Sequence, residues 1–172
     1  MEKSELNERL RKAAIDCGLC EQWQHEWEND WDSTKMISQF YRGIDFFLDK
    51  RFISNEFIKE NFDKDFLRKW GILVDDVYSL LNTRHAILIG NSTSTIRINN
   101  YNISEIYVID NSKAKIIAKD NAKVIVRLLG KAQIDVEKKG SANVTVINHS
   151  KDSVIISNEN IKIREEHNIF NV

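Results

Sequence analysis

The sequence contains no proline, and only two cysteines and six glycines occur among its 172 residues. It also has no Ser/Gly-rich tract, so no segment has the composition of a flexible or stiff interdomain linker. The formal net charge is -1, which argues against a basic surface of the kind that binds nucleic acid. We therefore expect two halves that pack against each other, and we do not expect nucleic acid as a partner.

Long apolar runs are also missing. No stretch of eighteen apolar residues occurs, and residues 1–8 carry too many charges for a secretory signal peptide. The sequence therefore predicts a cytoplasmic protein with no membrane partner. It also lacks a Gly-rich phosphate loop, an HExxH motif and a Ser/His/Asp set, so we predict no catalytic residue and no cofactor.

The two cysteines form a single CxxC motif, Cys17-Gly18-Leu19-Cys20, between two predicted helices. A redox-active CxxC opens a helix after a strand, so we interpret this pair as small structural residues. Together with His25 and Asp30, the spacing is similar to a retroviral-type zinc knuckle whose last cysteine is replaced. Because the tryptophans of this segment favour a helix, we predict no metal site, and zinc binding by Cys17 and Cys20 stays open.

The feature that the sequence does contain is a ten-residue repeat from about residue 86 to residue 158. One column of the repeat is apolar throughout and is predicted to be buried: Ala86, Ile96, Ile106, Ile116, Val126, Val136, Val146 and Ile156. Small or apolar residues recur two positions before and after this column, which is the spacing of one face of a strand. Turn-forming residues such as Asn111, Asn121 and Gly130 separate the strands. One strand and one corner cannot bury an apolar side alone, so the sequence predicts a parallel β-solenoid.

The outward-facing positions alternate in character with a period of twenty. In the repeats that begin near residues 85, 105, 125 and 145, seven of twelve outward residues are apolar, against two of twelve in the other repeats. This difference predicts a coil of about twenty residues with two main faces, one covered and one solvated. A triangular coil of thirty residues would mix the two sets. Nearly four coils fit in the repeat.

The more apolar face is predicted to be a partner-binding surface, because an apolar patch of this size is rarely left in water. Its residues are Ile87, Ile89, Tyr107, Ile109, Ile125, Arg127, Leu129, Ile147 and His149. The N-terminal helices, a protein partner or a second copy of the chain would cover it. The C-terminal end is the other candidate for self-association, because the core there turns polar at Lys138, Asn148 and Asn158. Four apolar residues beyond it could fold back as a plug or pair with a second molecule: Ile161, Ile163, Ile169 and Phe170.

The apolar spacing and capping residues predict a helical cap subdomain over residues 1–80, a solenoid over 81–160 and a capping tail over 161–172. Trp23, Trp27 and Trp31 are four residues apart and are predicted to line one face of a single helix. Ser33 or Thr34 is expected to cap the next helix, and a later helix is expected to begin at Ser54. A solenoid end exposes strand edges and an apolar cross-section, which a Trp- and Phe-rich helical segment would cover.

Two short segments carry a resemblance to other proteins. Tyr41-Arg42-Gly43-Ile44-Asp45-Phe46-Phe47 and the stretch from Phe66 to Asp75, followed by repeats with Asp-Asn-Ser/Ala corners, are similar to small proteins of gut Bacteroidetes and of their phages or mobile elements. The resemblance implies the same helical cap and solenoid, no catalytic residue, and a place in the host cytoplasm or the virion if the gene is carried by a phage. The coil also resembles, in general form, the β-helices of bactofilins, which lack a large helical head.

These features favour a non-enzymatic structural or protein-interaction protein that presents a rigid solenoid surface, including one encoded by a phage or mobile element. A homo-oligomer formed through the apolar face or the C-terminal end fits this hypothesis. The alternative is a carbohydrate- or nucleotide-binding module, or an enzyme, with a cleft between cap and coil. That alternative requires polar groups such as Arg127, Tyr107 and His149 to converge on the cleft.

Overall fold

The computed structural model describes residues 2–166, which divide into two compact units. The first unit contains the helices up to Asp63, and the second begins at Lys64. The boundary therefore lies earlier than residue 80, where the change from helical to strand patterning suggested it. The second unit includes one further helix before its first strand.

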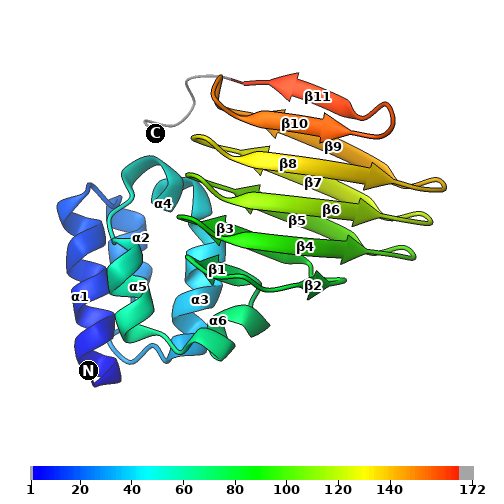
Figure 1. Ribbon diagram of the computed structural model, residues 1–172. Helices are drawn as coiled ribbons and strands as arrows, with labels where there is room; N and C mark the ends of the chain where they lie inside the picture. Colours follow the sequence, from blue (N-terminus) through cyan, green and yellow to red (C-terminus); the bar gives the residue numbers. More distant parts are fainter. Residues whose placement is uncertain (1, 167–172) are drawn as a thin grey trace. The chain divides into compact units, whose positions relative to one another are not determined.

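The first unit consists of five short helices (blue to cyan in Figure 1): α1 Lys3–Asp16, α2 Glu21–Glu26, α3 Ser33–Arg42, α4 Ile44–Lys50 and α5 Asn55–Asn61. The predicted cap at Ser54 is confirmed, because its hydroxyl accepts a hydrogen bond of 3.1 Å from the backbone N–H of Phe57. The cap of α3 is Asp32 rather than Ser33 or Thr34. Its carboxylate accepts a 2.8 Å hydrogen bond from the N–H of Lys35, which satisfies one of the unpaired donors at the helix start.

The prediction of one helix that carries three tryptophans is wrong. Helix α2 ends at Glu26, so Trp27 and Trp31 belong to the segment between α2 and α3. Their rings still meet, stacked with centroids 4.7 Å apart. The aromatic contact predicted from the spacing is therefore made by a loop.

Asn7, on α1, is hydrogen-bonded to the loop that follows α2. It is buried, its amide nitrogen donates to the carbonyl oxygen of Glu28 at 2.8 Å, and its amide oxygen accepts from the indole N–H of Trp27 at 2.8 Å. Part of the loop's hydrogen bonding is thus supplied by a neighbouring helix, so a non-helical backbone is tolerated there. Nothing in the sequence marked Asn7 for this role.

The second unit is a parallel β-solenoid, as predicted. It contains α6 (Lys64–Lys69) and eleven strands among the described residues: β1 Ile72–Val74, β2 Leu80–Leu81, β3 His85–Ile89, β4 Thr93–Ile98, β5 Ile103–Val108, β6 Lys113–Ala118, β7 Lys123–Leu128, β8 Gln133–Lys138, β9 Asn143–Asn148, β10 Val154–Ser157 and β11 Lys162–Glu165. The odd-numbered strands form sheet A and the even-numbered strands form sheet B. Figure 1 shows these strands as a stack of layers, from β1 and β2 at one end to β10 and β11 at the other.

The register confirms the predicted coil of about twenty residues. Ile106 of β5 lies beside Ala86 of β3 and Val126 of β7, and every such pair is twenty residues apart. The pairs of sheet B from β4 to β8 keep the same spacing. The strands extend beyond the predicted range of 81–160, because β1 and β2 form the first layer and β11 pairs with β9. The predicted tail of 161–172 therefore begins with a strand, and Ile169 and Phe170 lie outside the described residues.

The core runs along the inside of the stack. The predicted apolar column is fully buried from Ala86 to Val146. Each regular corner between strands contains one residue with a left-handed backbone: Gly90, Asn100, Asp110, Asp120, Gly130 and Gly140. Glycine, asparagine and aspartate tolerate this conformation best, which explains why these three residue types occupy the left-handed corner positions.

Two serines that face the core differ in their hydrogen bonding and supply a stability test. The hydroxyl of Ser94 donates to the carbonyl oxygen of Tyr78 at 2.7 Å, whereas the buried hydroxyl of Ser104 has no hydrogen-bond partner within the described chain. In the next layer, Ala114 lies beside Ser94 and Val124 lies beside Ser104. We expect Ser104→Ala to raise the free energy of unfolding by about 1 kcal/mol and Ser94→Ala to lower it by about 1 kcal/mol. Urea denaturation followed by circular dichroism measures both, and equal effects of the two substitutions would contradict this account.

The last layer corrects one part of the predicted core. Val154 and Ile156 were predicted to face inward, but they are 45% and 59% exposed. Strand β10 pairs with β8 at a spacing of twenty-one residues, so Ile155 lies beside Ile134 and packs against the core instead. The corner before β10 has one residue more than the regular corners, and Ser150 stands where those corners have glycine, asparagine or aspartate. A shift of one residue turns every side chain of a strand to the other face.

Candidate interaction surface

The nine residues of the predicted partner-binding face lie on the outer side of sheet A or at the ends of its strands. Ile87, Tyr107, Arg127 and Ile147 are neighbours in one row across β3, β5, β7 and β9. Six of the nine are buried, namely Ile87, Ile89, Tyr107, Ile109, Leu129 and Ile147. Arg127 and His149 are half-buried, and Ile125 is 38% exposed. The surface therefore offers few of its predicted apolar side chains to solvent.

Arg127 is the charged centre of this face. Its Nε donates to Glu105 at 3.1 Å, and its guanidinium lies 5.8 Å from the centre of the Tyr107 ring. Burial alone would lower the pKa of Arg127, but the hydrogen bond to Glu105 and the neighbouring Tyr107 raise it above its ordinary value. The guanidinium is thus held as a cation within a largely apolar row.

The two histidines of this face occupy different environments. The Nδ1 of His149 lies 2.9 Å from the carbonyl oxygen of Glu166, next to the last strand of the sheet. Burial lowers the pKa of His85. The positive charge of Arg84 lowers this pKa further, whereas the negative charge of Glu105 partly raises it. The three polar groups named for a ligand site, Arg127, Tyr107 and His149, are thus in contact with protein groups of their own sheet or, for His149, of the chain after β11.

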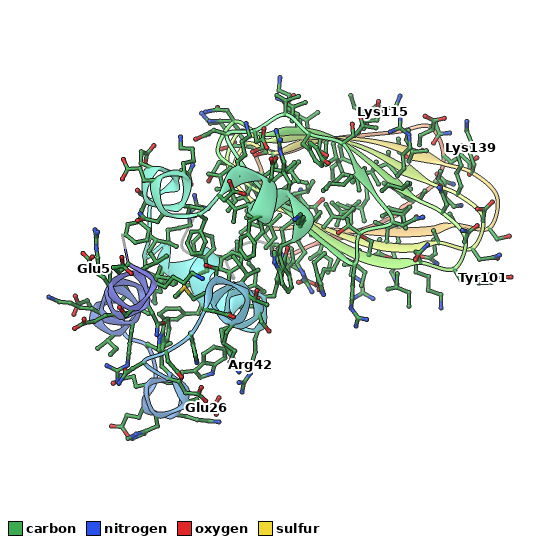
Figure 2. The ribbon with its side chains drawn as sticks, turned by 90° about the horizontal axis from the view of Figure 1, so that it is seen from below. Glu5, Glu26, Arg42, Tyr101, Lys115 and Lys139 are labelled. Carbon is green, nitrogen blue, oxygen red and sulfur yellow. The ribbon has the colours of Figure 1, made fainter. Side chains whose placement is uncertain are left out.

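Exposed apolar residues of sheet A gather at the starts of its strands. Tyr101 is 81% exposed and Ile103 is 63% exposed, and Ile125 lies on the adjacent strand β7. Figure 2 shows Tyr101 at the corner of the coil, pointing away from it. Each of these side chains is flanked by polar residues such as Lys123, so they form a narrow strip rather than a broad apolar patch.

The outer side of sheet B is charged, as predicted for the solvated face. Glu137 accepts from Lys139 at 2.7 Å and lies 3.6 Å from Lys115. The hydrogen bond from Lys139 and the charges of both lysines lower the pKa of Glu137. Figure 2 shows that Lys115 and Lys139 extend into solvent. Solvent-exposed ion pairs of this kind contribute little to stability.

The N-terminal end of the solenoid is closed within its own unit. Helix α6 packs against β1, and in Figure 1 it lies below the first layer of strands. Arg68 of this helix makes two hydrogen bonds to Asp76, from Nε at 2.8 Å and from Nη2 at 3.0 Å, and Lys64 contributes a third contact at 2.8 Å. Strands β1 and β2 are the terminal strands at this end and have only three and two residues, so their free edges are short, although Leu81 of β2 is 65% exposed.

At the C-terminal end, no helix follows the last strands in residues 2–166, and these strands are longer than β1 and β2. Strands β10 and β11 are the terminal strands of their sheets, so each has one edge that pairs with no other strand in residues 2–166. Val154, Ile156 and Ile163 of these two strands are 45%, 59% and 46% exposed. The sequence pointed to this end through the polar residues of the tapering core. It missed Val154 and Ile156, and the five-residue corner at 149–153 was the signal that could have found them.

No metal site is recognisable in residues 2–166, where no three His, Cys, Asp or Glu side chains lie together as a ligand set. Cys17 is half-buried and Cys20 is exposed, and both are free thiols. None of the helices in the same range is both long enough and apolar enough to span a membrane. Comparison with known protein families, with curated proteins and with solved structures found no match to this chain.

Proposed function

We propose that this chain is a non-enzymatic protein-interaction protein whose solenoid serves as a rigid mount for a binding site at its C-terminal end. The observation that supports this proposal is the asymmetry between the two ends of the coil. One end carries α6, the Arg68–Asp76 ion pair and terminal strands of only three and two residues, of which β2 exposes Leu81. The other end has terminal strands of four residues each, with exposed Val154, Ile156 and Ile163. Free edges flanked by apolar side chains favour pairing with another strand.

The stack below the C-terminal end explains why it would be suited to this role. From β3 to β9 the layers are joined by parallel ladders with a constant spacing of twenty residues, and the corners are fixed by hydrogen bonds such as that from the N–H of Gly90 to Asp110 at 2.9 Å. The interior is closed by fully buried aliphatic side chains such as Ile106 and Val126. A strand edge held on such a base loses little conformational freedom when it binds, which favours affinity.

Site-specific photocrosslinking tests the proposal. A photoreactive amino acid at position 156 is expected to give a covalent adduct with a partner protein in cells of the native host, because this side chain is 59% exposed beside a free edge. Position 103 on sheet A is the matched control, since Ile103 is 63% exposed but lies on a strand paired on both sides. Adducts from 156 and not from 103 support the proposal. Absence of adducts from both 156 and 163 would contradict it.

A further inference from the structure

We propose that the partner at the C-terminal end is a second copy of this chain, and that β10 pairs with its own counterpart as antiparallel strands about a two-fold axis at Ile155. This inference rests on the proposed function and identifies the partner. It depends on three features of the segment from Lys151 to Glu159: its backbone direction, the faces of its side chains and its charges.

The backbone of β10 places free hydrogen-bonding groups at the position of the axis. The N–H groups of Val154 and Asn158 donate to β8, to the carbonyl oxygens of Ala132 at 2.9 Å and Val136 at 3.2 Å. Because successive residues of a strand direct their backbone groups to opposite sides, Ile155 and Ser157 direct theirs to the free edge. Ile155 can therefore exchange both of its backbone hydrogen bonds with Ile155 of a second copy, as in a hydrogen-bonded antiparallel pair.

The side chains match themselves in the same register. Antiparallel pairing about Ile155 sets Val154 opposite Ile156 of the second copy, and the symmetry repeats that contact. Both side chains are on the outer face and exposed, whereas Ile155 faces the core and meets its own counterpart on the inner side. Apolar pairs directly opposite each other stabilise neighbouring antiparallel strands.

The flanking charges also agree with this register. The same symmetry sets Ser153 opposite Ser157 of the second copy. Beyond β10, it brings the turn that contains Lys151 toward the bend that contains Glu159 of the second copy. Both charged side chains are exposed, and Glu159 lies 3.6 Å from Lys138 of its own chain. A shift of the axis to Val154 would set Asp152 against Ile156, and a shift to Ile156 would set Val154 against Asn158. The axis at Ile155 is the one that pairs like with like and opposite charges together.

The opposite end of the solenoid explains why the assembly would stop at two copies. A chain of copies joined head to tail would need a free strand edge at the N-terminal end as well. That end has a helix against β1 and a β2 of two residues. An interface that uses the same surface on both copies closes after one contact, so a dimer is expected rather than a filament.

Sedimentation of the full chain over a range of concentrations tests the inference. We expect a dimer for the native sequence, and an affinity weakened about a hundredfold by Ile156→Lys, because each of two symmetric contacts loses apolar burial and gains a charge. Ile103→Lys is the matched control and should leave the dimer unchanged, since Ile103 is equally exposed on another face. Both positions are on the surface, and circular dichroism verifies that each variant is folded.

A charge exchange tests the register itself. Lys151→Glu and Glu159→Lys are each expected to weaken the dimer roughly tenfold, because each brings like charges toward each other twice. The double variant should restore the native affinity, although Glu159→Lys also loses the contact with Lys138. A native dimer that is unaffected by Ile156→Lys, or a double variant no better than the single ones, would overturn the inference. A native monomer that gives adducts from position 156 with a different protein would also overturn it, while leaving the proposed function intact.

Discussion

Gly71→Ala is expected to lower the free energy of unfolding of the solenoid by about 4 kcal/mol. Gly71 precedes β1 and has a left-handed backbone, with φ of 73°. A Cβ atom at this position would overlap the carbonyl oxygen of His85 and lie 3.2 Å from the hydroxyl of Thr83. The backbone of the next layer would have to move to relieve the overlap. That movement would strain the 2.8 Å hydrogen bond from the N–H of Ile87 to the carbonyl oxygen of Gly71, which joins the two layers.

Two further variants separate the overlap from the backbone strain. Gly140 has a similar φ of 66°, but a Cβ there would meet the backbone of Asp120 only at 3.4 to 3.5 Å. Gly140→Ala is therefore expected to cost about 1 kcal/mol, the strain of a left-handed alanine alone. Gly71→Asn relieves that strain and keeps the overlap, so it should remain nearly as destabilising as Gly71→Ala. Thermal denaturation monitored by circular dichroism compares the stability of the three variants. If Gly71→Ala is no less stable than Gly140→Ala, steric overlap at Gly71 is excluded as a source of destabilisation.

The regular part of the fold was predictable because its cause repeats. A residue such as Ile106 packs beside aliphatic residues twenty positions before and after it, Ala86 and Val126, so the same requirement for an apolar side chain recurs along the sequence. The corner residues repeat for a similar reason, since each left-handed position admits few residue types. The period of twenty was predictable from the polarity of the outward-facing residues. Successive repeats alternate between sheet A, whose outward residues are more apolar, and sheet B, whose outward residues are more polar.

The irregular parts were not predictable from periodicity, because each depends on a single event. One extra residue before β10 turns Val154 and Ile156 to the outer face of the sheet. Because both residues are still apolar, the sequence pattern gives no sign of this change. The helix predicted through Trp27 and Trp31 ends at Glu26, and the loop after it is hydrogen-bonded to one amide side chain, Asn7 of α1, twenty residues before Trp27. Such contacts are specific to one pair of residues and leave no pattern in the sequence.

The candidate surface was predictable in part. The row of Ile87, Tyr107 and Arg127 was placed on one sheet by the alternation of repeats, and the register does set these residues side by side. How much of each side chain meets solvent could not follow from alternation, since outward direction and exposure are separate properties. The C-terminal end was recognised from polar core positions, whereas its apolar contacts required the shifted register of β10.

Asp76→Ala is expected to lower the free energy of unfolding by about 3 kcal/mol, because Asp76 joins α6 to the first layers of the solenoid. The residue is buried, and besides Arg68 and Lys64 its carboxylate accepts from the N–H of Val77 at 2.8 Å. Its backbone N–H donates to the hydroxyl of Ser92, and its carbonyl oxygen accepts from Thr93. Removal of the carboxylate leaves the Nε and Nη2 of Arg68 and the backbone N–H of Val77 without their acceptor, while Nη1 of Arg68 keeps its bond to Asp65. The loss of these partly buried hydrogen bonds is the source of the expected cost.

Asp65→Ala is the matched control for charge, since Asp65 also bonds Arg68, at 2.9 Å, but its side chain is 78% exposed. It should cost less than about 0.5 kcal/mol. Denaturation with urea at neutral pH measures both variants. Equal losses in the two would show that Asp76 acts only as a surface charge.

The pH dependence gives the same contact a second test. Burial alone would raise the pKa of Asp76, but the hydrogen bonds from Arg68 and Lys64 outweigh it and hold the pKa below its ordinary range. A carboxyl whose pKa is lower in the folded state contributes its full stability above the ordinary aspartate pKa of about 3.9, and loses it as the pH falls through the folded value. The difference between the native protein and Asp76→Ala should therefore be constant from pH 7 to about pH 5 and should shrink below about pH 4. A difference that grows on acidification would mean that Asp76 is protonated in the folded protein, and the ion pair with Arg68 would then not be what holds α6 to the coil.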